Sequence, residues 1–335
     1  MKSFGAALWR MWLPPVVLAG VVLVLALTAA APGCAKKPDS GKVRVAASIF
    51  PLADVVRQIG GQHVQVDCML PTGRSPHGYE LTADNVAALH EARLLVLVGM
   101  DLESWGANGK QIAARRKATV LEVGPLAAGH VEADSDGHAH AAHNGHDHDA
   151  AHDDHADADA HVHHHQGDPH VWVDPVRMQA IATAVADALI GVDPAHKADY
   201  LANRDKFFAQ LRQLDAQYRT GLAGVKHKQL VTFHETFNYL CDRYGLEHAA
   251  LAPPGGSGDN SDRLAKVEAF IRKNNVKVIF LEPEFSPEKF ATVQSRTGVR
   301  TARLDPLGGE GLAGHDSYLA MMRTNLQTLT RELDR

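Results

Sequence analysis

Residues 43–70 read VRVAASIFPLADVVRQIGGQHVQVDCML, and this stretch decides the fold. The β-branched run at 43–47 predicts a strand, the longer run at 52–60 has helical spacing, and 64–70 predicts a second strand. Short strands that alternate with longer helices are typical of βα units on a largely parallel sheet. This part of the chain therefore predicts an α/β fold.

The same alternation recurs on both sides of a central helical region. Before that region we expect a helix around 83–92 and a strand at 94–98; after it we expect strands at 229–233, 276–281 and 299–304 and helices near 235–244 and 316–333. Two groups of βα units in a chain of 335 residues predict two lobes, because one average domain is shorter than this. The expected fold is α/β, with two βα lobes on mostly parallel sheets.

A long helix is expected between the lobes. Residues 174–190 have helical spacing, and Asp193 and Pro194 then predict an N-cap and a first helical residue. Apolar residues recur every three or four positions through the following segment, at Phe207, Leu211, Leu214, Tyr218 and Leu222. A helix of roughly 28 residues, about 40 Å long, could span two lobes. We place the N-terminal lobe at 43–173, the linking helices at 174–223 and the C-terminal lobe at 224–335.

The first 34 residues have the character of an export signal. Lys2 and Arg10 precede an apolar run from 11 to 31, and the sequence APGC ends at Cys34. This ending resembles a bacterial lipoprotein processing site, which would leave a lipid on Cys34 and residues 35–42 as a flexible tether. An uncleaved transmembrane helix is the alternative, since the run is long enough. Both interpretations place the rest of the chain outside the cytoplasm, in the periplasm or on the outer face of a bacterial membrane.

The composition argues against some classes of partner and is typical of a protein with a hydrophobic core. The net charge is −5 without a basic block, so we expect no nucleic acid as a partner. Hydrophobic residues make up 45% of the chain, which allows a sizeable core. Beyond Cys34 only Cys68 and Cys241 remain, and their separation favours two buried thiols over a disulfide.

Four candidate ligands lie just past predicted strands or at the mouths of loops: His77, His170, His234 and Asp305. Ligands of open α/β sheets collect at the carboxyl ends of strands, so two facing lobes would bring these side chains into one cleft. Three imidazoles and one carboxylate suit four-coordinate zinc. His77 and His170 each follow a proline, which fixes the local backbone. Asp305 could equally be a turn aspartate before Pro306.

The segment 129–166 is of low complexity, and twelve of the 21 histidines lie in it. It has too few large apolar residues to fold alone, and its composition is typical of metal binding. We expect its histidines and aspartates to collect zinc at the mouth of the cleft. A solvated loop without a role is the alternative.

The chain resembles the solute-binding lipoproteins of zinc and manganese ABC importers, and is most similar to the zinc-uptake proteins. The likeness extends over the mature chain through VAASIFPLADVVRQIGG, PHGYE, MDLESW, DPHVWVDP, TFHETFNYL, FLEPEFSPE and RLDPLG. It implies two lobes joined by a rigid helix, metal ligands at His77, His170, His234 and Asp305, and a monomer that delivers Zn²⁺ to an ABC permease and its ATPase. Manganese relatives usually carry glutamate at the position of His234, so histidine favours zinc over Mn²⁺ or iron.

Two other classes of function stay open at this point. A zinc hydrolase would need an open coordination position and a general base, for which Glu80 and Glu235 are the nearest carboxylates in sequence. Four protein ligands would close the site, so we expect a binding protein and no enzyme. An adhesin or a metal buffer without a transporter is the other alternative.

Overall fold

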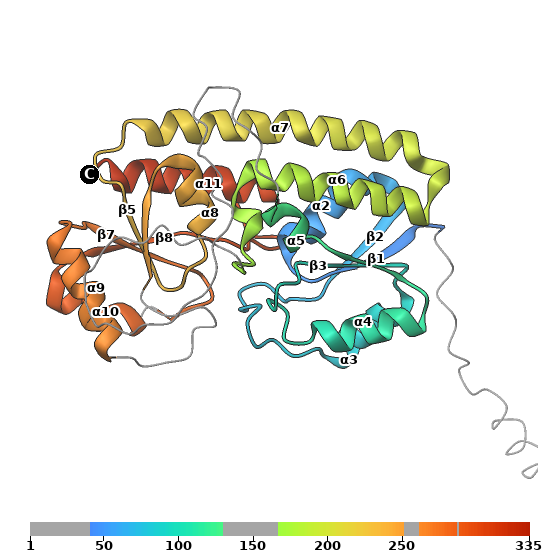
Figure 1. The fold of residues 1–335 in the computed structure, drawn as a ribbon, viewed down its shortest axis with the longest axis horizontal. Helices are drawn as coiled ribbons and strands as arrows, with labels where there is room; N and C mark the ends of the chain where they lie inside the picture. Colours follow the sequence, from blue (N-terminus) through green and yellow to red (C-terminus); the bar gives the residue numbers. More distant parts are fainter. Residues whose placement is uncertain (1–40, 130–166, 251–260, 287) are drawn as a thin grey trace, which may run out of the picture. The chain divides into compact units, whose positions relative to one another are not determined.

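Two parallel four-stranded sheets form the frame of the protein (Figure 1). The computed structural model describes residues 41–129, 167–250, 261–286 and 288–335. The first sheet has the order β2-β1-β3-β4 and the second has the order β6-β5-β7-β8. The strands are β1 (Val43–Ala47), β2 (Val64–Cys68), β3 (Leu94–Leu97), β4 (Thr119–Glu122), β5 (Gln229–Thr232), β6 (Glu247–Ala250), β7 (Val278–Leu281) and β8 (Arg300–Arg303). The predicted α/β class with two parallel sheets is confirmed.

Helices follow the strands in the order that βα units require. The α-helices are α2 (Phe50–Gly60), α3 (Ala83–Glu91), α4 (Gly106–Arg115), α5 (Gly124–Ala128), α6 (Pro175–Val192), α7 (Lys197–Ala223), α8 (Asn238–Tyr244), α9 (Ser261–Lys273), α10 (Glu288–Thr297) and α11 (Tyr318–Leu333). Three short 3-10 helices are η1 (Gly61–His63), η2 (Val171–Val173) and η3 (Pro194–His196). The expected export signal with Cys34, most of the tether and nearly all of the histidine-rich segment lie outside the described residues.

The central strands are buried because helices cover both of their faces. All four residues of β3 are buried, and the apolar side chains of β1 are at most 2% exposed. The edge strands β4 and β6 are more exposed, with polar residues at their ends. One hydrophobic core contains residues of both sheets and of α2, α6, α7 and α11, and a smaller core lies between β7, α9 and α10.

Helix α7 is the predicted long helix, with 27 residues and a length of about 40 Å. It packs on α2, which follows the first strand of the first sheet, on the preceding helix α6, and on α8 and α11, which flank strands of the second sheet (Figure 1). Near its start, the Asn203 side chain donates to the Ile59 carbonyl at 3.0 Å. Near its end, the Tyr218 hydroxyl donates to the Met322 carbonyl at 2.7 Å. Both halves are therefore fixed to one helix.

The start of α7 differs from the prediction. Asp193 precedes η3 and makes no side-chain cap, and α7 begins only at Lys197. The Asp193 carboxylate instead accepts a hydrogen bond from the Tyr200 hydroxyl at 2.5 Å and lies 2.6 Å from His196 Nδ1. The expectation that Asp193 caps the long helix is wrong, because the helix begins four residues later and the Oδ2 of Asp193 is engaged by both of these side chains.

Helix α6 is long and apolar enough, by length and composition, to cross a membrane. It packs against α2, α5 and α7, and half of its length is buried inside the protein, as a core helix requires. The thiols of Cys68 and Cys241 are both free, one in β2 and the other buried in α8.

A buried ion pair joins α6 to α8. Asp174, 1% exposed, caps α6 by accepting from the Val176 amide, and Arg243 Nε lies 2.6 and 2.7 Å from its two oxygens. Removing Arg243 would leave the buried carboxylate with only the more distant Arg177, whose Nε lies 3.5 Å from Asp174 Oδ2, and this should cost more than the loss of an exposed pair.

We expect Arg243→Gln to lower the free energy of unfolding by about 3 kcal/mol. Urea denaturation of the metal-free protein measures this change. The matched control is Arg296→Gln, which breaks an exposed pair with Glu268 and should cost less than about 1 kcal/mol. Equal losses in the two variants would show that the buried pair has no special role.

Candidate metal centre

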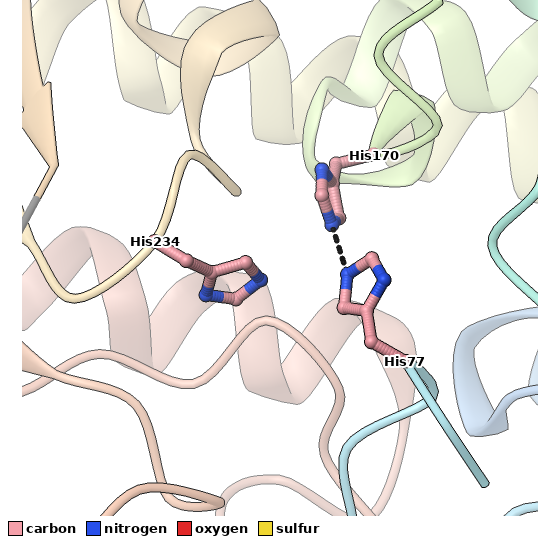
Figure 2. Close-up of side chains that lie close together, drawn as sticks. All are labelled: His77, His170 and His234. Carbon is pink, nitrogen blue, oxygen red and sulfur yellow. Dashed lines mark hydrogen bonds between the residues drawn. The ribbon is translucent and has the colours of Figure 1, made fainter. Parts of the chain in front are cut away.

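Three histidines from separate loops meet in one site (Figure 2). His77 lies between β2 and α3, His170 directly precedes η2, and His234 follows β5. One ring nitrogen from each lies within 4.8 Å of the others, and Nε2 of His77 is 3.2 Å from Nε2 of His170. Two nitrogens bound to one tetrahedral zinc ion are about 3.3 Å apart, given Zn–N bonds of about 2.05 Å. His77 and His170 are thus already at a spacing that suits a zinc ion, and a nitrogen of His234 lies within 4.8 Å of both.

Burial keeps two of these imidazoles neutral. His234 is 3% exposed, and burial lowers its pKa to about 4. Burial and the neighbouring His170 and His234 rings together lower the pKa of His77 to about 3. A neutral ring carries the lone pair that a metal needs. Protonation of His77 or His234 would place charge in a dehydrated cluster, so we expect protons to compete with metal for these two rings at a lower pH than the ordinary histidine pKa of about 6.5 would give.

Asp168 orients the His170 ring. Its Oδ1 lies 2.7 Å from His170 Nδ1 and accepts from the His170 amide, and its Oδ2 accepts from Asn238 Nδ2 at 3.1 Å. Burial acts to raise the pKa of Asp168, but the hydrogen bonds from His170 outweigh it and hold that pKa below its usual range. A carboxylate on Nδ1 leaves Nε2 as the nitrogen for the metal.

Glu282 has the same role behind His234. Its Oε2 lies 2.7 Å from His234 Nδ1, and its Oε1 accepts from the His234 amide at 3.3 Å. The Thr236 hydroxyl donates to Glu282 Oε2 at 2.8 Å, and its oxygen lies 3.0 Å from Nδ1 and 2.7 Å from Nε2 of His234. Glu282 is 1% exposed, and burial raises its pKa. Of the two outer carboxyl groups, Asp168 supplies negative charge close to the proposed ion, whereas the pKa of Glu282, raised to about 8, favours its protonated form at neutral pH.

The sequence reasoning did not identify these two carboxylates. It considered Glu80 and Glu235, but Glu80 is exposed and Glu235 is half-buried. Glu282 could have been found, because it directly follows the buried strand β7, the neighbour of β5. Asp168 could have been found from its place two residues before His170.

Asp305, the predicted fourth ligand, is not part of the three-histidine group in the structure. It is 5% exposed and follows β8. Its Oδ1 accepts from the Leu307 and Gly308 amides at 2.9 and 2.8 Å, and its Oδ2 lies 3.1 Å from His315 Nδ1. The Trp172 indole donates to the Pro306 carbonyl at 2.8 Å, which ties this turn to the His170 segment. Metal ligation by Asp305 stays a prediction.

Comparison with known proteins gives the family. The family described as ZnuA, zinc-uptake complex component A, periplasmic, matches residues 45–332. The chain belongs to the ZnuA family. The predicted resemblance to zinc-uptake binding proteins is therefore confirmed, and members of this family are solute-binding proteins.

Two curated relatives and one solved structure show the extent of the likeness. The zinc-binding lipoprotein AdcA of Streptococcus pneumoniae is 28% identical over 306 residues, which is 89% of this chain and 57% of AdcA. This chain thus spans little more than half of that relative. The high-affinity zinc uptake system protein ZnuA of Yersinia pestis is 28% identical, over 92% of this chain and 93% of the relative. The crystal structure of the Zn(II)-bound ZnuA-like domain of S. pneumoniae AdcA superposes with a TM-score of 0.66 at 25% identity, over 88% of this chain and 100% of that domain.

The lowered pKa of His234 has a consequence for stability. In the unfolded chain this ring binds a proton below about pH 6.5, whereas in the folded protein it stays neutral down to about pH 4. Its contribution to stability is therefore complete above pH 6.5 and is lost as the pH falls from 6.5 to about 4.

As the pH falls from 6.5 to about 4, the free energy of unfolding should decrease in the metal-free wild type and in metal-free His234→Gln. We expect the decrease to be about 3 kcal/mol smaller in His234→Gln, because this variant has no ring to protonate at position 234. Denaturant unfolding at several pH values measures the difference. The exposed His90→Gln serves as the control and should follow the wild type. Parallel curves for all three proteins would contradict a buried, neutral His234.

Proposed function

We propose that this chain is the extracytoplasmic zinc-capture subunit of an ABC importer. The observation that carries the proposal is the convergence of His77, His170 and His234, whose ring nitrogens lie within 4.8 Å of one another. Membership of the ZnuA family supports the same conclusion.

The donor set favours zinc over harder ions. Imidazole suits zinc, whereas manganese prefers oxygen ligands. Asp305 is the proposed fourth ligand, which would give three neutral nitrogens and one carboxylate around the ion. To reach the ion, the Asp305 carboxylate must move relative to the three rings and give up or share its contact with His315. Manganese or iron transport by a member of the same family is the alternative.

Ion capture would need small movements only. His170 and His234 are buried and held by carboxylates, while His77 is half-buried on a loop. Because α7 is fixed to both halves, wide opening of the halves would break its contacts. We infer that zinc enters and leaves by movements of the His77 loop and of the turn that carries Asp305.

A binding role accounts for the site better than a catalytic one. Four protein ligands leave no position for an activated water, and Glu80 is exposed to solvent. We propose that the protein has no enzymatic activity. Turnover of ester or peptide substrates by the zinc-loaded protein, lost in His170→Ala, would contradict this.

The remaining parts of the proposal concern location and partners. We propose that residues 1–34 direct export, that Cys34 anchors the protein by a lipid, and that an ABC permease with its ATPase receives the zinc. The histidine-rich segment 129–166 would collect ions before transfer to the main site.

Alanine at His77, His170 or His234 should each weaken zinc binding by about 100-fold or more. Changing an outer partner of a ligand alone costs about 10- to 100-fold, and loss of the ligand itself should cost at least as much. Asp305→Ala tests the fourth position in the same way. Competition with a chelating dye measures affinity, in a chain that lacks residues 130–166 so that other histidines do not obscure the result.

His90→Ala is the control, because this side chain is exposed on α3 and should leave affinity unchanged. The shortened wild-type chain should bind one zinc ion tightly. Tight binding that survives two of the ligand changes would refute the site.

Loss of the protein should slow zinc accumulation by cells at low external zinc, with little effect when zinc is abundant. Uptake of radioactive zinc measures this, and re-expression of the wild type but not of His170→Ala should restore it. Unchanged uptake would favour a metal buffer or an adhesin.

A further inference from the structure

His248 lies behind the three-histidine site and belongs to none of the sequence motifs. It is half-buried in β6, an edge strand of the second sheet. Its Nδ1 is 2.5 Å from the Asn238 side-chain oxygen, and its Nε2 is 2.7 Å from the Thr232 hydroxyl. Asn238 and Thr232 are each hydrogen-bonded in turn toward a histidine of the metal site, His170 and His234 respectively.

The first branch runs through Asn238 to His170. The Asn238 amide group donates from Nδ2 to Asp168 Oδ2 at 3.1 Å, and Asp168 Oδ1 holds His170 Nδ1 at 2.7 Å. A flipped amide would place its oxygen against a carboxylate, so this orientation is required. The oxygen of Asn238 therefore faces His248 and accepts a hydrogen bond from its Nδ1–H.

The second branch runs through Thr232 to His234. The Thr232 hydroxyl donates to the His234 carbonyl at 2.7 Å. A hydroxyl has one proton to donate, so its oxygen can only accept from His248 Nε2. Each ring nitrogen of His248 thus acts as a donor, which requires the protonated, cationic ring. Through Asn238 and Thr232 the two donors reach the ring of His170 and the backbone of His234.

We propose that His248 is a positioning residue that sets the spacing between His170 and His234 for the zinc ion. This inference rests on the proposed function. His170 follows the first sheet in the chain and His234 belongs to the second, and one imidazole is hydrogen-bonded toward both. A planar ring with donors at two separated points can hold both branches at once. The flexible amide of glutamine or the methyl group of alanine cannot donate to Asn238 and Thr232 in this way.

The fold does not depend on this side chain. The backbone ladder between β5 and β6 pairs four residues, including Leu230 with His248, and needs no side chain from His248. Its ring is half-buried in an edge strand and not in the core. Loss of the ring should therefore act mainly on the metal site.

The test compares His248→Ala and His248→Gln with the wild type, all in the chain lacking residues 130–166. Zinc affinity is measured by dye competition, and the visible absorption of bound Co²⁺ reports the geometry of the ligands. We expect His248→Ala to weaken zinc binding by about 10-fold and to change the Co²⁺ spectrum. His248→Gln should be intermediate, and His90→Gln should match the wild type.

A double-mutant cycle with Asn238→Ala distinguishes positioning from a general loss of packing. If both residues act through one network, the double variant should lose little more affinity than the worse single variant. Additive losses, or affinity and a Co²⁺ spectrum that stay at wild-type values in His248→Ala, would overturn the inference. A drop in thermal stability of the metal-free variants without a spectral change would also overturn it. Failure of the shortened wild type to bind zinc would refute the proposed function itself.

Discussion

The site depends on one constraint, that three imidazoles share a space from which water is largely excluded. A protonated ring there would lose its hydration and repel its neighbours, so burial lowers the pKa of His77 and of His234. Rings that cannot take up protons easily keep their lone pairs for a cation. Carboxyl groups lie behind two of the rings, Asp168 at His170 and Glu282 at His234. Asp168, whose pKa is lowered, supplies negative charge there, whereas burial raises the pKa of Glu282 to about 8. The rings thus face the ion as neutral ligands.

The frame that holds these groups follows from the topology of the two sheets. In each sheet the first strand lies between the second and the third, so that successive connections leave on opposite sides and a crevice forms at the carboxyl ends. His234 follows β5 and Glu282 follows β7, the two strands that border the crevice of the second sheet. Helix α7 and the Asp174–Arg243 pair then tie the second half to the first. A shift of either half would therefore change the spacing of the ligands directly.

The strands and helices that could be predicted from the sequence are those in which the local hydrophobic pattern matches the burial that the folded protein imposes. Strand β1 has the predicted bounds, since its buried β-branched run has no competing interpretation. The edge strands β4 and β6 were not predicted, because they are short, partly exposed and rich in polar residues or alanine. The three histidines could be proposed from their place after strands and from the family likeness. Asp168 and Glu282 could not be assigned their roles, and the contact between Asp305 and His315 depends on how the chain folds back between β8 and α11. Spacing along the sequence does not encode such contacts.

The residue at position 234 is coupled to Glu282, and this coupling bears on the choice of metal. Glu282 is buried, and its Oε2 lies 2.7 Å from a ring nitrogen of His234. A glutamate at 234, the residue that the family likeness gives to manganese relatives, would place a second carboxylate beside it. Like charges at that distance in a buried site repel strongly, so an ionised ligand at 234 would hold Glu282 in the protonated form that burial already favours by raising its pKa to about 8. An oxygen ligand at 234 would therefore depend on that proton of Glu282, whereas a neutral imidazole can donate its Nδ1 proton to Glu282. The preference for imidazole, and through it for zinc, thus belongs to the pair of residues and not to His234 alone.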